Sequence, residues 1–476
     1  MILNAYNAYT IKFKNSYSLH KNKACMKLTF LGAVGTVTGS KYLLDTESMR
    51  LMVDCGLFQG LKDLRLRNWA PFPVDPKTID AVILTHAHLD HSGYLPLLAK
   101  LGFKGEIHCS QATRDLCRIL LLDSAHIQEK DAEFHNKHKT SKHDPALPLY
   151  TVDDVLAVME QFKTHAFKEA FTLREGVQVL FRHAGHILGA ASVELQANGK
   201  TIVFSGDLGR PNDPVMWPPA PVPKADYLLI ESTYGNRIHD SADTEERLAE
   251  IITRTAKRGG KVVIPSFAVG RSQSLLYILS KLKNAHRIPN LPIYLDSPMA
   301  VEASKMIHRF PHDHRLSPDQ CKAMDHVATY TTSVEESKAI ANYHGPMVIL
   351  SASGMATGGR ILHHLRQYLP DRRNTVVLAG FQAEGSRGRS LQDGQKSIKI
   401  FGKQVAVHAE IETIHALSAH ADSNEILDWL KQIKRSPKRI FVTHGESEAA
   451  AALAQRIHSE LGWECVVPKQ DDQVEI

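Results

Sequence analysis

The chain has 476 residues, of which 43% are apolar and 23% charged, a composition typical of a globular protein with two or three domains. No apolar run reaches the roughly 18 residues of a spanning helix, so no membrane partner is expected, and the six scattered cysteines form no C-x-x-C pair, which favours a reducing, cytoplasmic location. Lys and Arg exceed Asp and Glu by 57 − 51 = 6, which permits an anionic partner without requiring one.

Residues 1–25 are polar and lack periodicity, and we predict an N-terminal extension that the fold does not require. From Met26 the pattern becomes β-rich. Short apolar strands separated by turn residues are predicted at 40–45, 50–54, 80–85, 104–109, 177–182, 192–196 and 201–205. A charged, helical interruption covers about 111–168.

A proline-rich connector follows, with six prolines in residues 211–223. The pattern then alternates between strands and helices, as in a parallel, doubly wound sheet. Strands are expected at 225–230, 261–265, 292–296, 347–351 and 375–380, with helices such as 244–257 and 272–282 between them. The tail returns to the first pattern, with strands at 405–411 and 438–443 and helices at 424–434 and 447–461.

The clearest chemical signal is an H-x-H-x-D-H motif that begins where a buried strand ends. Its four candidate ligands are His86, His88, Asp90 and His91. Residues two apart on an extended chain point the same way, so His86 and His88 project together. Imidazole and carboxylate groups in this arrangement suit two cations side by side, and we prefer this interpretation to a polar loop with chance histidines.

Four ligands cannot complete two metal shells, so others must come from distant parts of the chain. His186 lies between glycines, Asp207 follows a predicted strand, and His444 ends another. Each alone is a weak signal, but three such groups at strand ends beside the H-x-H-x-D-H motif favour a metal centre.

Together these residues resemble the metallo-β-lactamase fold and, within it, the β-CASP nucleases, which include the RNase J proteins and the endonuclease that matures eukaryotic mRNA 3′ ends. Asp54 in V-D-C-G is similar to the first lactamase-fold motif, and Glu231 and His420 are similar to β-CASP signatures. The resemblance implies an α/β fold, a metallo-β-lactamase αββα sandwich with an inserted doubly wound β-CASP domain. The implied division is an extension at 1–25, a first lactamase-like part at 26–235, a β-CASP domain at 236–395 and a second lactamase-like part at 396–476.

The resemblance also implies two Zn²⁺ ions per chain, with Mn²⁺ left open. We assign His86, His88 and His186 to one ion and Asp90, His91 and His444 to the other, with Asp207 bridging them. Glu231 is expected to orient His420, the candidate general acid, and Asp54 to hold a ligand imidazole. Asp90, Glu231, His420 and Asp54 are the predicted catalytic residues.

His444 stands where the DNA-repair branch of the family has an aliphatic residue, so the resemblance implies single-stranded RNA as substrate. We expect a zinc-dependent ribonuclease that cuts internally, with 5′-exonuclease action and a homodimer left open. Two alternatives are another lactamase-fold hydrolase of small esters or thioesters and a non-catalytic RNA-binding subunit. The 237 residues between Asp207 and His444 argue against the first, and the complete set of candidate ligands argues against the second.

Overall fold

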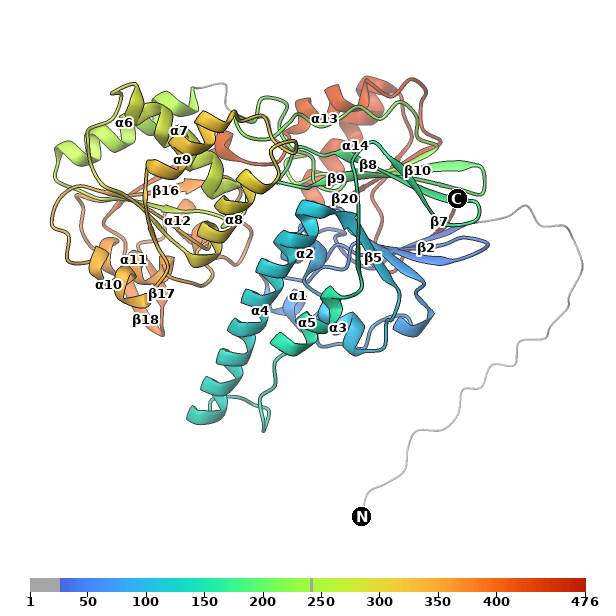
Figure 1. Ribbon diagram of the computed structural model, residues 1–476, viewed down its shortest axis with the longest axis horizontal. Helices are drawn as coiled ribbons and strands as arrows, with labels where there is room; N and C mark the ends of the chain where they lie inside the picture. Colours follow the sequence, from blue (N-terminus) through green and yellow to red (C-terminus); the bar gives the residue numbers. More distant parts are fainter. Residues whose placement is uncertain (1–25, 240–242) are drawn as a thin grey trace, which may run out of the picture.

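A computed structural model describes residues 26–239 and 243–476, so the extension predicted at 1–25 lies outside the described residues. The chain forms two lobes side by side (Figure 1). One lobe combines the N-terminal half with the C-terminal helices, and the other holds the segment between them. The C-terminal segment therefore returns to the lobe in which the chain began.

The first lobe contains two seven-stranded sheets. One has the order β22-β1-β2-β3-β4-β5-β6, in which β3 to β6 are parallel. The strands are β1 (Lys27–Phe30), β2 (Tyr42–Asp45), β3 (Arg50–Val53), β4 (Ala81–Ile83), β5 (Glu106–Ser110), β6 (Phe162–His165) and β22 (Gln473–Glu475). Strand β4 is buried at every position, which explains its unbroken apolar sequence.

The second sheet has the order β21-β20-β11-β10-β9-β8-β7, and β10, β11 and β20 run parallel. Its strands are β7 (Ala170–Arg174), β8 (Val177–His183), β9 (Ala191–Ala197), β10 (Lys200–Phe204), β11 (Tyr227–Glu231), β20 (Arg439–Thr443) and β21 (Cys465–Val466). The two sheets pack face to face over an apolar core, where the rings of Phe30 and Phe441 lie 5.2 Å apart between centroids.

Helices cover the outer faces of both sheets and complete an αββα sandwich. Leu98, Leu116 and Val155 of the covering helices pack on the first sheet, and Ile426 and Leu453 pack on the second. The helices of this lobe are α1 (Lys62–Arg67), α2 (Leu89–Ser92), α3 (Leu95–Lys100), α4 (Gln111–His138), α5 (Val152–Met159), α13 (Ser423–Leu430) and α14 (Ser447–Leu461), with 3-10 turns η1 (Pro76–Thr78) and η2 (His415–Leu417). Helix α4 extends beyond the sandwich, and its upper part packs against α8 of the other lobe.

The second lobe is a parallel sheet of the order β14-β13-β15-β12-β16-β19 with helices on both faces, as predicted. Its strands are β12 (Val262–Pro265), β13 (Ile293–Asp296), β14 (Thr329–Thr331), β15 (Val348–Ser351), β16 (Thr375–Ala379) and β19 (Glu410–Ile414). The helices are α6 (Thr244–Lys257), α7 (Arg271–Asn284), α8 (Pro298–Arg309), α9 (Pro318–His326), α10 (Val334–Ile340), α11 (Ile361–Tyr368) and α12 (Arg387–Gln392), and β17 (Ser397–Ile400) pairs with β18 (Lys403–Ala406) as a hairpin.

The end of the inserted lobe differs from the sequence-based prediction. The single strand predicted at 405–411 is two strands, β18 and β19, and β19 pairs with β16 over Glu410–Ile414. Strand pairing places Glu410–Ile414 in the sheet of the inserted lobe, and the domain boundary between residues 395 and 396 stays a prediction. Apolar periodicity identifies a strand but does not say which sheet it joins.

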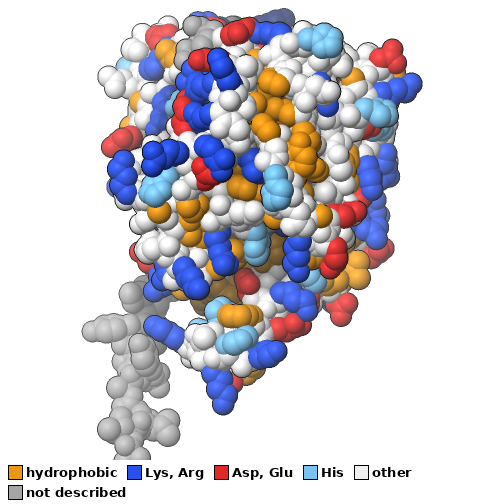
Figure 2. Space-filling view, turned by 90° about the vertical axis from the view of Figure 1, so that its left-hand side faces the viewer, with side chains coloured by type: hydrophobic (Ala, Val, Ile, Leu, Met, Phe, Trp, Pro, Cys, Tyr) orange, Lys and Arg blue, Asp and Glu red, His pale blue; other side chains and the backbone are white. Residues whose placement is uncertain are grey.

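Charged side chains are mixed over the face that the inserted lobe presents (Figure 2). Lys and Arg are spread across this face, with Asp and Glu among them. The mixture agrees with the small formal net charge of +6. Among residues 26–239 and 243–476, no helix is both long and apolar enough to cross a bilayer.

Candidate metal centre

The candidate site lies at the carboxyl ends of the parallel strands of both sheets in the first lobe. Asp54 follows β3, the H-x-H-x-D-H motif follows β4, and Asp207 follows β10, while Glu231 ends β11 and His444 follows β20. The carboxyl ends of parallel strands meet at one edge of a sheet, so residues far apart in the sequence converge there.

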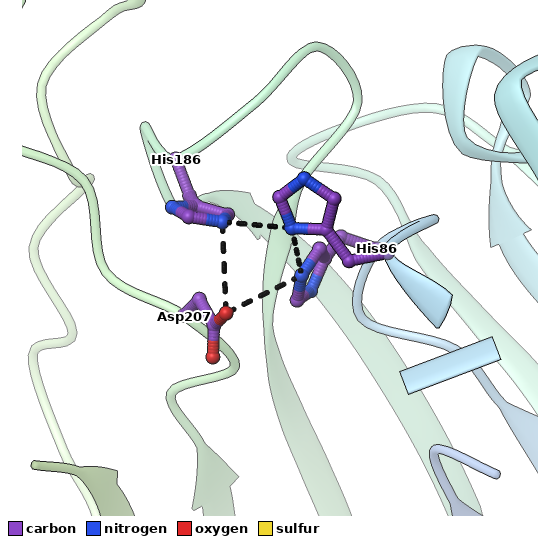
Figure 3. A group of neighbouring side chains, drawn as sticks. His86, His186 and Asp207 are labelled. Carbon is purple, nitrogen blue, oxygen red and sulfur yellow. Dashed lines mark hydrogen bonds and ion pairs between the residues drawn. The ribbon is translucent and has the colours of Figure 1, made fainter. Parts of the chain in front are cut away.

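A first group of four side chains is His86, His88, His186 and Asp207. His88 Nδ1 lies 3.2 Å from His86 Nε2 and 3.1 Å from His186 Nε2. Asp207 Oδ2 lies 3.4 Å from His86 Nε2 and 3.5 Å from His186 Nε2. Figure 3 shows His86, His186 and Asp207 turned toward one point between them. These separations match the edges of about 3.3 Å of a tetrahedron with metal–ligand bonds of about 2.0 Å.

A second group shares Asp207 with the first. His91 Nε2 lies 3.0 Å from His444 Nε2, and Asp90 Oδ2 lies 3.5 Å from His444 Nε2 and 3.9 Å from His91 Nε2. Asp207 Oδ1, the oxygen that faces away from the first group, lies 3.3 Å from both His91 Nε2 and His444 Nδ1. One carboxylate therefore stands between two groups of candidate ligands.

The protons available in the first group do not satisfy its acceptors. His186 donates its Nδ1–H to the Ala419 carbonyl at 3.2 Å, so its Nε2 lone pair faces His88 Nδ1. Burial lowers the pKa of His88 to about 3 and lowers the pKa of His86 and His186 as well, so all three rings are neutral at pH 7. Three neutral imidazoles do not have enough N–H groups to pair the nitrogen lone pairs that converge there.

Two buried atoms in the site have no hydrogen-bond partner among the described residues, His88 Nε2 and Asp207 Oδ1. Buried polar groups are normally paired, so an orphaned carboxylate oxygen between converging imidazoles indicates a missing positive charge. The donor set of imidazole nitrogens and carboxylate oxygens is the one that zinc prefers. The residues present therefore fit two divalent cations.

Asp54 fixes the orientation of one candidate ligand. Its Oδ2 accepts the Nδ1–H of His91 at 2.7 Å, which fixes the ring so that Nε2 faces the second group. The backbone N–H and hydroxyl of Thr85 also donate to Asp54, at 2.8 and 2.9 Å. Asp54 and His444 both adopt left-handed backbone, with φ of 57° and 49°, a strain that is common at functional sites.

Glu231 and His420 form a pair beside the two groups. His420 Nδ1–H donates to Glu231 Oε1 at 3.1 Å, and the backbone N–H of Leu208 donates to the same oxygen at 2.6 Å. Burial opposes protonation of His420, but the carboxylates of Glu231, Asp207 and Asp90 together outweigh it and leave the pKa of His420 raised. The His420 side chain is 18% exposed and lies 4.0 Å from Asp207, so it is placed to exchange a proton at the edge of the site.

A neighbouring group, His239, Asp422 and Glu425, has ligand-like spacing but is satisfied by its own hydrogen bonds. Asp422 caps α13 and accepts the backbone N–H of His239, and Glu425 binds Arg210. His239 Nε2–H donates to the His420 carbonyl at 2.9 Å. This group therefore holds the loop that carries His420.

The inserted lobe contacts the site through the loop between β12 and α7. The Phe267 ring lies 6.3 Å from the His88 ring between centroids, and a Cβ built on Gly270 would lie 2.7 Å from Ile187 in the loop of His186. Gly270 has φ 84°, so glycine is favoured there both by conformation and by the close approach.

The structure brings together all ten residues that the sequence singled out. Sequence reasoning missed Thr85, Phe267 and Gly270. Thr85 directly precedes the H-x-H-x-D-H motif, and its hydroxyl was the signal that could have identified it. Phe267 and Gly270 lie in a loop at the carboxyl end of a strand, which is where α/β sheets place ligand contacts.

Three family models match the chain. The metallo-beta-lactamase superfamily model matches residues 34–233, the Beta-Casp domain model matches 272–391, and a model described as a Zn-dependent metallo-hydrolase RNA specificity domain matches 404–468.

Curated relatives match over most of their length. Ribonuclease TTHA0252 of Thermus thermophilus is 37% identical over 90% of this chain and 95% of its own. The transcription termination factor FttA of Methanosarcina mazei is 32% identical over 92% of this chain and 69% of its own. An RNase J-like protein of Methanocaldococcus jannaschii is 31% identical over 93% of this chain and 97% of its own.

Proposed function

This chain belongs to the metallo-β-lactamase superfamily and to the group within it that carries a β-CASP insertion, and we propose that it is a zinc-dependent ribonuclease that cuts single-stranded RNA internally with two cations. The matches confirm the family resemblance and the fold class predicted from the sequence. Family membership also makes the chain a metal-dependent hydrolase. The observation that carries the finer proposal is the pair of ligand groups joined by Asp207.

His86, His88 and His186 would hold one cation, and Asp90, His91 and His444 the other, with one oxygen of Asp207 facing each group. When bound, two divalent cations lower the pKa of water from about 15.7 toward about 7 and offset the negative charge on the phosphate oxygens. Asp54 keeps the Nε2 lone pair of His91 directed at its group.

His420 would donate a proton to the 3′-oxygen that leaves when the phosphodiester bond breaks. Glu231 holds its Nδ1–H, so the free Nε2 is the atom that exchanges the proton. Partial exposure gives the spent imidazole access to solvent for reprotonation. Water attack with this acid predicts products with a 5′-phosphate and a 3′-hydroxyl.

RNA is supported as substrate by the RNA specificity model over 404–468, by the ribonucleases among the relatives, and by His444 at the position that distinguishes RNA-processing members. The complete set of candidate ligands supports an enzyme over a non-catalytic RNA-binding subunit. A cytoplasmic location and a homodimer remain predictions, and light scattering measures the second.

The test is cleavage of single-stranded RNA labelled at either end, with and without a chelator, by wild type and by Asp90→Ala. We expect internal cuts by the wild type alone, loss with chelator and restoration by Zn²⁺ or Mn²⁺. Asp428→Ala, which removes an exposed carboxylate, is the matched control and should cleave normally. Chelator-resistant cleavage, equal cleavage by Asp90→Ala, or products with a 3′-phosphate would contradict the proposal.

A further inference from the structure

A surface groove crosses the junction of the two lobes, outside the metal centre. One wall includes Gln111, the first residue of α4, and the other includes Arg309, the last residue of α8, beside the contact between these helices (Figure 1). The groove has a volume of about 690 Å³, and through Thr164 and His165 it continues along β6 into a second hollow of about 550 Å³. Pockets of this size hold ligands as large as a nucleotide.

Two stacked pairs of aromatic rings line the groove. The His165 ring lies 3.4 Å from the Phe171 ring between centroids, and the Phe167 ring lies 3.8 Å from the His183 ring. All four residues are half-buried, so part of each ring remains open to the groove. Burial lowers the pKa of His165 and lowers that of His183 to about 4, so both imidazoles are neutral at pH 7. Each pair therefore offers a flat, uncharged surface on which an unstacked nucleobase can lie.

Several polar side chains on the walls are available to a ligand. Among residues 26–239 and 243–476, no hydrogen bond or ion pair occupies the side chains of Gln111, Thr164, Lys168, His183 and His312. Together they offer an ammonium, an amide, a hydroxyl and two imidazoles, and so both donors and acceptors. The groove can therefore recognise the polar edges of a base as well as its face.

Cations outnumber carboxylates along the groove and its continuation. The cations on the walls are Arg114, Lys163, Lys168 and Arg309, and the carboxylates are Glu106 and Asp313. Lys163 lies 3.7 Å from Glu106, and Arg309 lies 3.1 Å from Asp115. Lys168, in contrast, has no carboxylate partner in the part of the chain that the structure describes, so its charge is left for an anion. Positive charge beside aromatic surfaces suits the phosphates and bases of a single strand.

The groove borders the loop that carries His186 of the metal centre. His183 on its wall ends β8, and His186 follows in the next loop. Ser110, also on the wall, donates its hydroxyl to the Gly189 carbonyl of that loop at 2.7 Å. The groove is therefore adjacent to the metal centre but uses different side chains.

We propose that this groove is a second binding site for the single-stranded RNA, which takes nucleotides that flank the scissile bond. Bases stack on the two ring pairs, and Lys168 binds a backbone phosphate. The inference rests on the proposed function, because the ligand is the RNA that the metal centre would cut. A duplex is a poorer ligand, since its bases are stacked on one another and cannot lie on protein rings.

The first test compares two substrates of the metal-loaded full chain. One is a labelled single-stranded RNA long enough to fill the groove, and the other is bis(p-nitrophenyl) phosphate, a phosphodiester too small to extend from the metal centre into it. Lys168→Gln and Phe167→Leu should each raise KM for the RNA about 10-fold with little change in kcat, because they remove contacts made equally in the ground and transition states. Hydrolysis of the small diester should keep the wild-type rate.

The second test measures RNA binding by fluorescence anisotropy in the cleavage-deficient Asp90→Ala background. Lys168→Gln should reduce the slope of log affinity against log salt by about 0.7, the value for one phosphate contact to a single strand. Phe167→Leu should leave the slope unchanged and weaken binding of the single strand more than binding of a duplex. Lys257→Gln, which removes an exposed lysine at the end of α6, is the matched control and should bind as the background does.

Phe167 also packs on the core, so the melting temperature is recorded for each variant, and Lys168→Gln tests the groove independently of it. Unchanged KM and RNA binding in both variants would overturn the inference while cleavage by the wild type upholds the proposed function. Slower hydrolysis of the small diester, or equal weakening of single strand and duplex by Phe167→Leu, would also overturn it. Absence of RNA cleavage by the metal-loaded wild type would instead overturn the proposed function.

Discussion

Two buried clusters of His and Asp lie at the carboxyl ends of parallel strands, one around Asp207 in the first lobe and one around Asp296 in the inserted lobe. Asp296 ends β13 and is fully buried. Its oxygens accept hydrogen bonds from Arg360 at 2.7 Å and His364 at 2.7 Å, and from the hydroxyls of Thr331 and Ser337. This carboxylate is saturated with donors, and its charge is balanced by an arginine.

Asp207, unlike Asp296, lacks hydrogen-bond donors for one of its oxygens in the part of the chain that the structure describes. Its Oδ1 has no hydrogen-bond donor among the described residues, although ring nitrogens of His91 and His444 lie 3.3 Å away. On the side of Oδ2, the nitrogens of His86, His88 and His186 converge without enough protons to pair them. Both clusters combine histidine with a buried aspartate at the carboxyl end of a parallel strand. What distinguishes a metal centre from a structural network is therefore the balance of protons and charge, not the number of histidines.

The largest effect is expected at the shared ligand. Asp207→Asn keeps the shape of the side chain but removes the negative charge between the two groups. We expect the bound metal, measured by mass spectrometry, to drop below two ions per chain, and RNA cleavage to fall about 10⁴-fold or more, since the cations supply both nucleophile and charge stabilisation. A variant that kept both ions and its activity would show that Asp207 is, like Asp296, a structural carboxylate.

The next largest effect is expected at His420, where a variant distinguishes proton donation from metal binding in the cluster around Asp207. His420→Ala should retain both ions, because His420 contacts the ligand groups only at their edge, and cleavage should fall about 10²- to 10⁴-fold through loss of the general acid. His344→Ala, an exposed histidine, is the control and should leave the rate unchanged. Loss of metal together with activity would instead assign His420 to a ligand role.

The sequence predicted the parts of the molecule that depend on local chemistry. Helix α6 begins after the cap Asp243, and α14 ends before Gly462 with φ 70°, so both were predicted to the residue. The motif from His86 to His91 and the strand-end positions of Asp207 and His444 likewise indicated a common edge. The assignment of those residues to one metal centre also drew on the family resemblance.

The parts that depend on contacts between lobes could not be predicted in the same way. Strand β19 has an ordinary strand sequence, and only its pairing with β16 assigns it to the inserted lobe. Phe267 lies in a segment without an acidic or histidine motif, and its relation to His88 exists only after the lobes pack. Which carboxylates are saturated also depends on donors from three separate elements, β14, α10 and α11 with its N-cap, as Asp296 shows.

A stability effect without metal loss is expected in the inserted lobe. Asp296→Asn removes the charge of a fully buried carboxylate that pairs with the partly exposed Arg360, and should lower the free energy of unfolding by about 3 kcal/mol, measured by urea titration, with metal content unchanged. Its hydrogen bonds and charged neighbours lower the pKa of Asp296, despite burial, below the unfolded value of about 3.9. The stabilisation is therefore present above about pH 4 and lost as the pH falls further, so the difference between wild type and variant should shrink on acidification. A difference independent of pH would show that the charge of Asp296 is not what stabilises the lobe.

The smallest effect tests whether a hydrogen bond sets the state of one ligand. In Asp54→Asn, an amide N–H₂ in place of Oδ2 cannot accept the Nδ1–H of His91, so the ring would favour the tautomer with its proton on Nε2, the atom that faces His444. Thr85 still finds an acceptor in the amide oxygen, so the loop should keep its conformation. We expect chelator competition to show one of the two sites weakened about 10- to 100-fold and the other unchanged. Ser40→Ala, which removes only a 3.5 Å contact to Asp54, should have little effect on either site. Only the group that contains His91 depends on where the His91 ring carries its proton. Equal weakening of both sites would therefore mean that Asp54 supports the whole cluster rather than His91 alone.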